Sequence, residues 1–135
     1  MVDKNDLATA RSAVLLATLP PDVSTAILQR AVVKGYDRGE TIFFQGDVSE
    51  HIFVVLDGWV KLFRITPTGA EAVVGVFTKG RSFGEAVAFE DIPYPVTAEA
   101  VTDSRILLVK TSILSSMMRE RPEIALTEQL RAWRA

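Results

Sequence analysis

The residues best suited to chemistry in this sequence form one short segment, Phe83-Gly84-Glu85. Glycine has no Cβ, so Gly84 allows the backbone to approach a ligand closely. If a short helix opens at Glu85 and Ala86, its first backbone amides point toward a bound anion, and a phosphate suits that position. The alternative is that Glu85 only caps or orients its own turn. We therefore take this segment as the candidate ligand-binding site, with that alternative open.

Catalytic chemistry is not expected from the remaining polar residues. The chain has no cysteine, which excludes a thiolate nucleophile, a disulfide framework and cysteine-ligated zinc or iron–sulfur sites. Ser82 and Ser104 fall in expected turns with no histidine assigned nearby. Glu85, Glu90 and Asp91 could form an acid and base pair for hydrolysis, but acids grouped at a helix end are usually solvated or capping. A barrel-shaped metal enzyme of the cupin type would need several histidines, and the chain has one.

Length and composition indicate a single globular domain. The chain has 135 residues, 48% hydrophobic and 24% charged. Fifteen basic and seventeen acidic side chains give a net charge of −2, so this segment alone is not expected to bind DNA. The N-terminus is polar, and the apolar run 13–17 is too short for a signal sequence or a membrane span. We expect a cytoplasmic protein without a membrane partner.

The middle of the chain has a sequence pattern typical of strands and turns. Short β-branched and aromatic runs are cut by glycine every seven to twelve residues, and they predict strands at 33–36, 41–44, 52–56, 60–66, 70–77, 96–101 and 105–109. Pro67-Thr68-Gly69 predicts a tight hairpin turn. No long helical crossover lies between residues 32 and 83, so the strands must pair antiparallel. The expected fold is mainly β with flanking helices, an antiparallel jelly roll or double-stranded β-helix.

Helical periodicity returns at both ends of the chain. Residues 6–17 and the segment after Pro20 predict two short helices, and a third is expected from Thr111 or Ser112 to Arg119. A last, long helix is expected over 122–135, with an apolar stripe at Leu126, Leu130 and Trp133. That stripe could pack on the chain's own sheet, or it could pair with the same stripe of a second copy in a homodimer. We adopt the homodimer interpretation. The expected division is a sensor domain at 1–121 and the start of a dimerisation helix at 122–135, within a longer parent chain.

The phenylalanines could suggest a stacking surface for single-stranded nucleic acid. They lie within apolar strands, however, so core packing is the expectation. The set is Phe43, Phe44, Phe53, Phe63, Phe77, Phe83 and Phe89.

Three segments in a fixed order carry a family resemblance. They are Gly39-Glu40-Thr41-Ile42-Phe43-Phe44-Gln45-Gly46-Asp47, Phe53 to Arg64, and Gly80-Arg81-Ser82-Phe83-Gly84-Glu85. Together they resemble the cyclic-nucleotide-binding domains of CRP/FNR-type bacterial transcription regulators, over about residues 15–135. The resemblance implies a domain that senses a small-molecule effector and reports through the long helix. It also implies that DNA is bound only through a helix-turn-helix domain that would follow Ala135.

The resemblance also implies roles for residues of the site. In cyclic-nucleotide binders of this family, the glutamate matching Glu85 accepts a hydrogen bond from the ribose hydroxyl. An arginine about ten residues later holds the cyclic phosphate, and Pro95 stands at that position here. Neither Arg81 nor Arg105 matches it. Thr97 could offer a hydroxyl or be plain strand surface. The predicted ligand-binding residues are Phe83, Gly84, Glu85, Ala86, Val96 and Thr97.

Loss of the arginine predicts that cyclic AMP and cyclic GMP do not bind at micromolar concentrations. The Pro-Tyr-Pro sequence is typical of the FNR and nitric-oxide-responsive branches of the family, and without cysteine the chain cannot hold an iron–sulfur cluster. Haem stays open as a cofactor, with His51 as the available axial ligand, although its setting predicts an exposed loop. The alternative function is a cyclic-nucleotide-binding domain of a channel, kinase or transporter.

Overall fold

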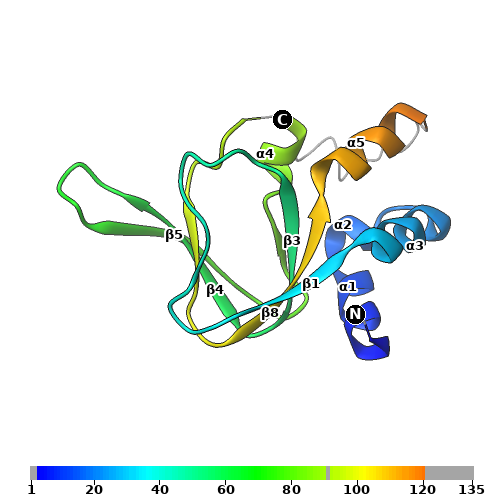
Figure 1. The fold of residues 1–135 in the computed structure, drawn as a ribbon, viewed down its shortest axis with the longest axis horizontal. Helices are drawn as coiled ribbons and strands as arrows, with labels where there is room; N and C mark the ends of the chain where they lie inside the picture. Colours follow the sequence, from blue (N-terminus) through cyan, green and yellow to red (C-terminus); the bar gives the residue numbers. More distant parts are fainter. Residues whose placement is uncertain (1–2, 91, 121–135) are drawn as a thin grey trace.

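The computed structural model describes residues 3–90 and 92–120, in which four of the five helices given below lie along one side of a β-roll and α4 lies at one end of it (Figure 1). The helices are α1 (Lys4–Ser12), α2 (Val14–Ala17), α3 (Pro21–Arg30), α4 (Glu85–Glu90) and α5 (Thr111–Glu120). The strands are β1 (Val32–Tyr36), β2 (Thr41–Phe43), β3 (His51–Asp57), β4 (Trp59–Ile65), β5 (Glu71–Thr78), β6 (Ser82–Phe83), β7 (Thr97–Ala100) and β8 (Ser104–Lys110).

The strands form two four-stranded sheets in which every pair is antiparallel. One sheet has the order β1-β8-β3-β6 and the other β2-β7-β4-β5. Successive strands alternate between the sheets over much of the chain, which is the connectivity of a jelly roll. The predicted fold class is confirmed. The long helix expected over 122–135 lies outside the described residues.

Strand β3 is the centre of the fold because both of its faces are buried. Side chains alternate across a strand, so successive residues enter different cores. Ile52, Val54 and Leu56 pack with the apolar residues of α1 to α3. Phe53 and Val55 face the interior of the roll. The helices therefore cover one side of the β3 sheet, and the interior of the roll lies on its other side.

The predicted hairpin is formed by β4 and β5. Its turn is closed by a hydrogen bond of 2.8 Å from the Thr66 backbone N–H to the Ala70 carbonyl. The pair runs from Trp59 opposite Thr78 to Ile65 opposite Glu71, with a bulge between Leu62 and Phe63. Strand β5 is the outer strand of its sheet, and the hairpin extends away from the helices (Figure 1).

The N-terminal helical region is divided more finely than predicted. Residues 6–17 do not form one helix, because Ala13 takes an extended conformation that separates α1 from α2. Asp3 caps α1 by accepting a hydrogen bond of 2.8 Å from the Asp6 backbone N–H. The Asp6 carboxylate in turn accepts hydrogen bonds of 3.0 and 2.7 Å from the Arg105 guanidinium, which tie α1 to β8.

The expectation of core packing for the phenylalanines is wrong at Phe44. Phe44 follows β2 and is 61% exposed, whereas Phe43 beside it is buried. Phe44 lies just beyond the end of the strand, so the alternation that buries Phe43 points it outward. No helix among residues 3–90 and 92–120 combines the length and the hydropathy needed to span a membrane.

Candidate functional site

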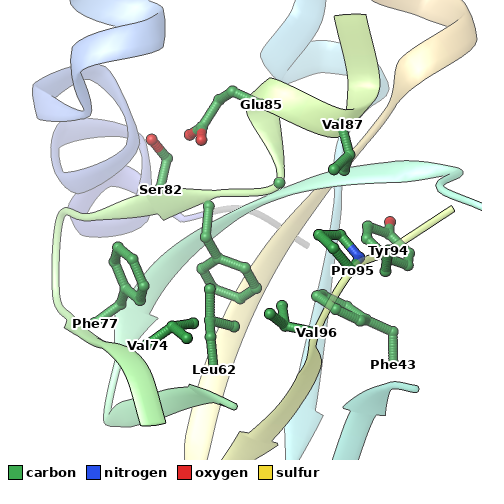
Figure 2. A pocket seen from close by; sticks show the side chains of 12 residues that line it. Phe43, Leu62, Val74, Phe77, Ser82, Glu85, Val87, Tyr94, Pro95 and Val96 are labelled. Carbon is green, nitrogen blue, oxygen red and sulfur yellow. The ribbon is translucent and has the colours of Figure 1, made fainter. Parts of the chain in front are cut away.

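A cavity of about 290 Å³ lies in the roll beside β6 and the start of α4. Its walls come from both sheets, from α4 and from the segment that leads into β7 (Figure 2). The residues that line it are Phe43, Leu62, Val74, Phe77, Ser82, Phe83, Gly84, Glu85, Val87, Tyr94, Pro95 and Val96.

Gly84 shapes the turn between β6 and α4. Its φ of +93° favours glycine, and a Cβ at this position would lie 3.3 Å from the His51 carbonyl oxygen and 3.5 Å from the Phe53 ring. The absence of a side chain therefore lets the turn pack against β3. This holds the start of α4 at the end of the cavity.

Glu85 is the acidic residue of the cavity wall, and it is buried with 9% exposure. Its Oε1 has no hydrogen-bond partner. Burial raises the pKa of the carboxyl, while hydrogen bonds from the Ser82 hydroxyl and from its own backbone amide lower it. Figure 2 shows the Ser82 and Glu85 side chains turned toward each other, on one side of β6. The two side chains lie across β6 from Phe77, Val74 and Leu62 (Figure 2), on the face of the sheet that Val54, the partner of Ser82, shares with the helices.

The remainder of the cavity is apolar and rich in aromatic rings. Phe43 and Tyr94 stack with their ring centroids 3.8 Å apart. Phe83 stacks on Phe53 at 5.0 Å and contacts Phe77 at 5.6 Å. The Tyr94 hydroxyl donates to the His51 carbonyl at 2.9 Å and accepts from the His51 N–H at 3.2 Å. Tyr94 therefore gives its ring to the cavity and its polar group to β3.

The described lining of the cavity has no cationic side chain. Among the described residues that line it, none is a lysine, arginine or histidine. Pro95, at the position where the family arginine was expected, lines the wall and adds no charge. Arg81 lies outside the lining with its guanidinium 5.9 Å from the Phe77 ring, and Arg105 is engaged with Asp6.

The structure places the predicted ligand-binding residues in three settings. Phe83, Gly84, Glu85 and Val96 come together around the cavity. Ala86 lies in the first turn of α4. Thr97 is buried, which corrects the interpretation of plain strand surface, and its hydroxyl accepts a hydrogen bond of 2.9 Å from the Gln45 backbone N–H. The binding role of the set stays a prediction.

Sequence reasoning missed much of the wall. The lining residues that were not predicted are Phe43, Leu62, Val74, Phe77, Ser82, Val87 and Tyr94. Leu62 and Phe77 could have been found from the alternation of side chains along the predicted hairpin. Val74 could not, because it is three residues from Phe77 and is the unpaired residue at the register shift between the two strands. Tyr94 carries no such signal, because its position depends on the fold of the segment before β7.

His51 does not lie in an exposed loop, contrary to the prediction. It begins β3, its side chain is half-buried, and burial lowers the pKa of the imidazole. The prediction failed because β3 begins one residue earlier than its apolar run. His51 lines a second cavity, of about 230 Å³, which shares Phe43 and Tyr94 with the lining of the Gly84 cavity. It is absent from the described lining of the Gly84 cavity, so a haem in that cavity would have no histidine ligand from the described residues, and haem binding stays a prediction.

Metal-binding chemistry has no evident centre in the part of the chain that the structure describes. In residues 3–90 and 92–120, no three histidine, cysteine, aspartate or glutamate side chains come together as metal ligands would. Asp91 was considered with Glu85 and Glu90 as part of an acid and base pair for hydrolysis. It lies outside the described residues, so this hypothesis stays untested.

The two antiparallel sheets, the Gly84 turn and the cavity under α4 define a jelly-roll domain built around a small-molecule-sized site. A family model described as "cyclic nucleotide-binding domain" matches residues 33–121. The chain belongs to this family.

Known regulators and solved structures agree with that assignment. A CRP-like cAMP-activated global transcriptional regulator of Mycobacterium tuberculosis is 28% identical over 110 residues, which are 82% of this chain and 48% of the regulator. The crystal structure of a candidate cyclic nucleotide binding protein of Ruegeria pomeroyi is 49% identical with a TM-score of 0.91, over 98% of this chain and 58% of that one. The sensor domain of the transcriptional regulator DNR of Pseudomonas aeruginosa is 27% identical with a TM-score of 0.78, over 90% of this chain and 81% of that domain.

These relatives confirm the resemblance to effector domains of CRP/FNR-type regulators. The chain spans about half the length of the Mycobacterium regulator that it matches.

Proposed function

We propose that this chain is the effector-sensing domain of a longer CRP/FNR-type transcription regulator, and that its effector is not a cyclic nucleotide. The chain acts as a regulatory module and not as an enzyme. It binds its effector in the Gly84 cavity and works as a homodimer in the cytoplasm. DNA is contacted by a separate domain of the longer protein. The relatives and the cavity beside α4 support the regulatory role.

The charge of the cavity lining is the observation that supports the exclusion of cyclic nucleotides as effectors. A cyclic phosphate is an anion, and an anion is stable in an apolar site only where charged or hydrogen-bonding groups replace its water. Here Pro95 occupies the position of the expected arginine, and no lysine, arginine or histidine is among the described lining residues. A cyclic nucleotide would therefore bring its negative charge into an apolar site with no cation in its described lining.

Titration calorimetry with cyclic AMP and cyclic GMP tests the proposal. The wild-type chain is expected to show no binding at micromolar concentrations, and Pro95→Arg is expected to gain affinity by at least tenfold, because one charge-assisted hydrogen bond is worth about 1.5 to 3 kcal/mol. Pro93→Arg is the matched control, because Pro93 is exposed and outside the cavity lining. Micromolar binding by the wild type would refute the exclusion of cyclic nucleotides.

A further inference from the structure

We propose that the second cavity, the one lined by His51, is a separate site that binds a small organic ammonium ion. This cavity shares Phe43 and Tyr94 with the Gly84 cavity but otherwise has its own described lining, from β1, β2, β3, β8 and the segments beside them. The inference goes beyond the proposed function, because it does not depend on which effector the Gly84 cavity binds.

The inner wall of the second cavity is aromatic. Tyr36, Phe43, Phe53 and Tyr94 line it, and all four are buried. Phe43 stacks on Tyr94 with ring centroids 3.8 Å apart, and its centroid lies 5.3 Å from that of Phe53. An aromatic ring has a negative face, so it attracts an ammonium ion more strongly than a neutral group of the same shape. Such a wall favours an organic cation, which also buries methyl or methylene groups there.

The rim of the second cavity supplies two carboxylates. Asp47 and Glu50 are exposed residues of its lining. One Asp47 oxygen accepts a hydrogen bond of 3.0 Å from the Phe44 backbone N–H, which holds that carboxylate in place. Burial raises the pKa of the Tyr94 hydroxyl, and the charges of Glu50 and Asp47 raise it further, so both acids act on the aromatic wall. They would balance the charge of a cation at the mouth and repel an anion.

The positive groups of this region do not cancel the acids. Lys34 is exposed and is the lysine of the described lining, which contains no arginine. His51 carries little charge at neutral pH, because burial lowers the pKa of its imidazole. Lys110 pairs with His51 between β8 and β3 but is not a lining residue. The described lining therefore has two acids and one full positive charge.

Lys34 indicates where the ligand's ammonium group would lie. Its Nζ lies over the Tyr36 ring, 5.0 Å from the centroid, and both residues line the cavity. The chain thus already holds an ammonium group of its own against this wall. Lysine has a flexible stem and a strongly hydrated head, so the Lys34 side chain can move into solvent when a ligand cation takes its place.

The size of the ligand follows from the cavity volume. An apolar protein cavity of about 150 Å³ can hold one benzene, and the second cavity, at about 230 Å³, is roughly half as large again. A quaternary ammonium group with a short side chain fits this volume. Choline is therefore a suitable probe.

Choline and its neutral isostere test the ligand class on the intact chain. In 3,3-dimethyl-1-butanol a carbon replaces the nitrogen of choline, so the shape is kept and the charge is lost. Amide chemical shifts should follow saturable binding of choline at one site per chain, about tenfold tighter than binding of the alcohol. The shifts are expected at Tyr36, His51 and Tyr94. Equal affinities, no saturable binding of choline, or shifts confined to other residues would refute the proposal.

Lys34→Met tests the displacement of the internal ammonium. Removal of the like charge from the Tyr36 ring is expected to tighten choline binding at least threefold. Lys61→Met is the matched control, because the Lys61 Nζ lies 5.1 Å from the Phe63 ring centroid, outside the described lining, and it should leave choline binding unchanged. Weaker binding by Lys34→Met would show that Lys34 pairs with an anionic group, which contradicts the cationic ligand class.

Glu50→Gln tests the acidic rim. It removes one of the two negative charges, so choline binding is expected to weaken at least threefold, while binding of the neutral alcohol is unchanged. Glu90→Gln is the control, because Glu90 is exposed and lies outside the described lining of the second cavity. If the two variants bind choline equally well, the rim does not select a cation and the assignment of this site is wrong.

Discussion

Glu85 is placed where a carboxylate is least stable in the described structure. It is buried, one of its oxygens has no partner, and burial raises the pKa of the carboxyl. An unsatisfied buried polar group costs about 1 to 3 kcal/mol. The ligand-free domain therefore gives up stability at this residue, as functional sites commonly do.

Glu85→Gln is expected to raise the free energy of unfolding by about 1 kcal/mol at neutral pH, because it removes the buried charge. Since folding raises the pKa of Glu85, the protonated carboxyl contributes stability that is complete below its ordinary value of 4.5 and is lost as the pH rises through the folded-state pKa. The advantage of the glutamine variant should therefore shrink toward pH 4. Urea unfolding at several pH values measures it.

Glu90→Gln is the control for this prediction, because Glu90 lies on the same helix and is exposed. It should leave the free energy of unfolding unchanged. A Glu85→Gln variant that is less stable than the wild type at neutral pH would show that the carboxylate is satisfied in solution.

Local sequence located the site but not the environment of every residue in it. Phe83-Gly84-Glu85 was found because the turn chemistry is local, and the structure brings it to the cavity with Val96. The environments of Thr97 and His51 were misjudged, because they depend on Gln45 and Tyr94, which are distant in sequence. A hydrogen-bond partner 52 or 43 residues away leaves no periodic signal.

At the scale of elements, an ion pair between α1 and β8 adds to the apolar packing of α1 against the sheet. Asp6 is buried and accepts two hydrogen bonds from Arg105 on β8. The Arg105 side chain is 45% exposed, so water screens the pair and limits its contribution.

Asp6→Asn is expected to lower the free energy of unfolding by about 1 kcal/mol at pH 7. The hydrogen bond from Arg105 lowers the pKa of Asp6, so the contribution is present above the ordinary value of 3.8 and is lost as the pH falls through the folded-state pKa. Chemical denaturation at pH 7 and pH 3 measures the change. Asp3→Asn is the control, because asparagine caps a helix as well as aspartate does. A loss that persists undiminished at pH 3 would contradict the ion-pair explanation.

The turn between β3 and β4 depends on Gly58. Its φ is +99°, and a Cβ there would overlap the Ser104 side chain and lie 2.7 Å from the Asp103 carbonyl oxygen. Gly58→Ala is expected to destabilise the chain by at least about 2 kcal/mol, through strain and overlap together. Gly39→Ala carries similar strain at a φ of +84° without any neighbour within 4 Å, so it should cost only about 1 kcal/mol. Thermal unfolding compares them, and equal losses would rule out the overlap at Gly58.

The sequence predicted elements best where a local pattern determines them. The β4–β5 hairpin has both an alternating pattern and a turn sequence, and it formed as expected. Strand β6 was missed because it has two residues, and its pairing with β3 is set by tertiary structure. The break at Ala13 was missed because the residues on both sides of it favour a helix, and packing against β3 decides the geometry.

At the scale of the whole molecule, a sensing domain needs a second arrangement that the effector can favour. We expect an effector beside Gly84 and Glu85 to shift the packing of the roll against the helix predicted over 122–135, and so to change the geometry of a dimer. That helix lies outside the described residues, so its apolar stripe of Leu126, Leu130 and Trp133 stays a prediction from spacing.

Leu130→Asp tests the stripe. If Leu126, Leu130 and Trp133 form the contact between two copies, a carboxylate at the centre of the stripe would be buried beside its twin, and like charges in a desolvated contact are strongly unfavourable. We expect at least a tenfold weaker dimer by sedimentation equilibrium. Thr127→Asp adds the same charge about a quarter turn away from the stripe, so it should leave association nearly unchanged. A wild-type chain that sediments as a monomer, or two variants that associate equally well, would show that the stripe serves the chain's own fold and would move the signalling contact elsewhere in the molecule.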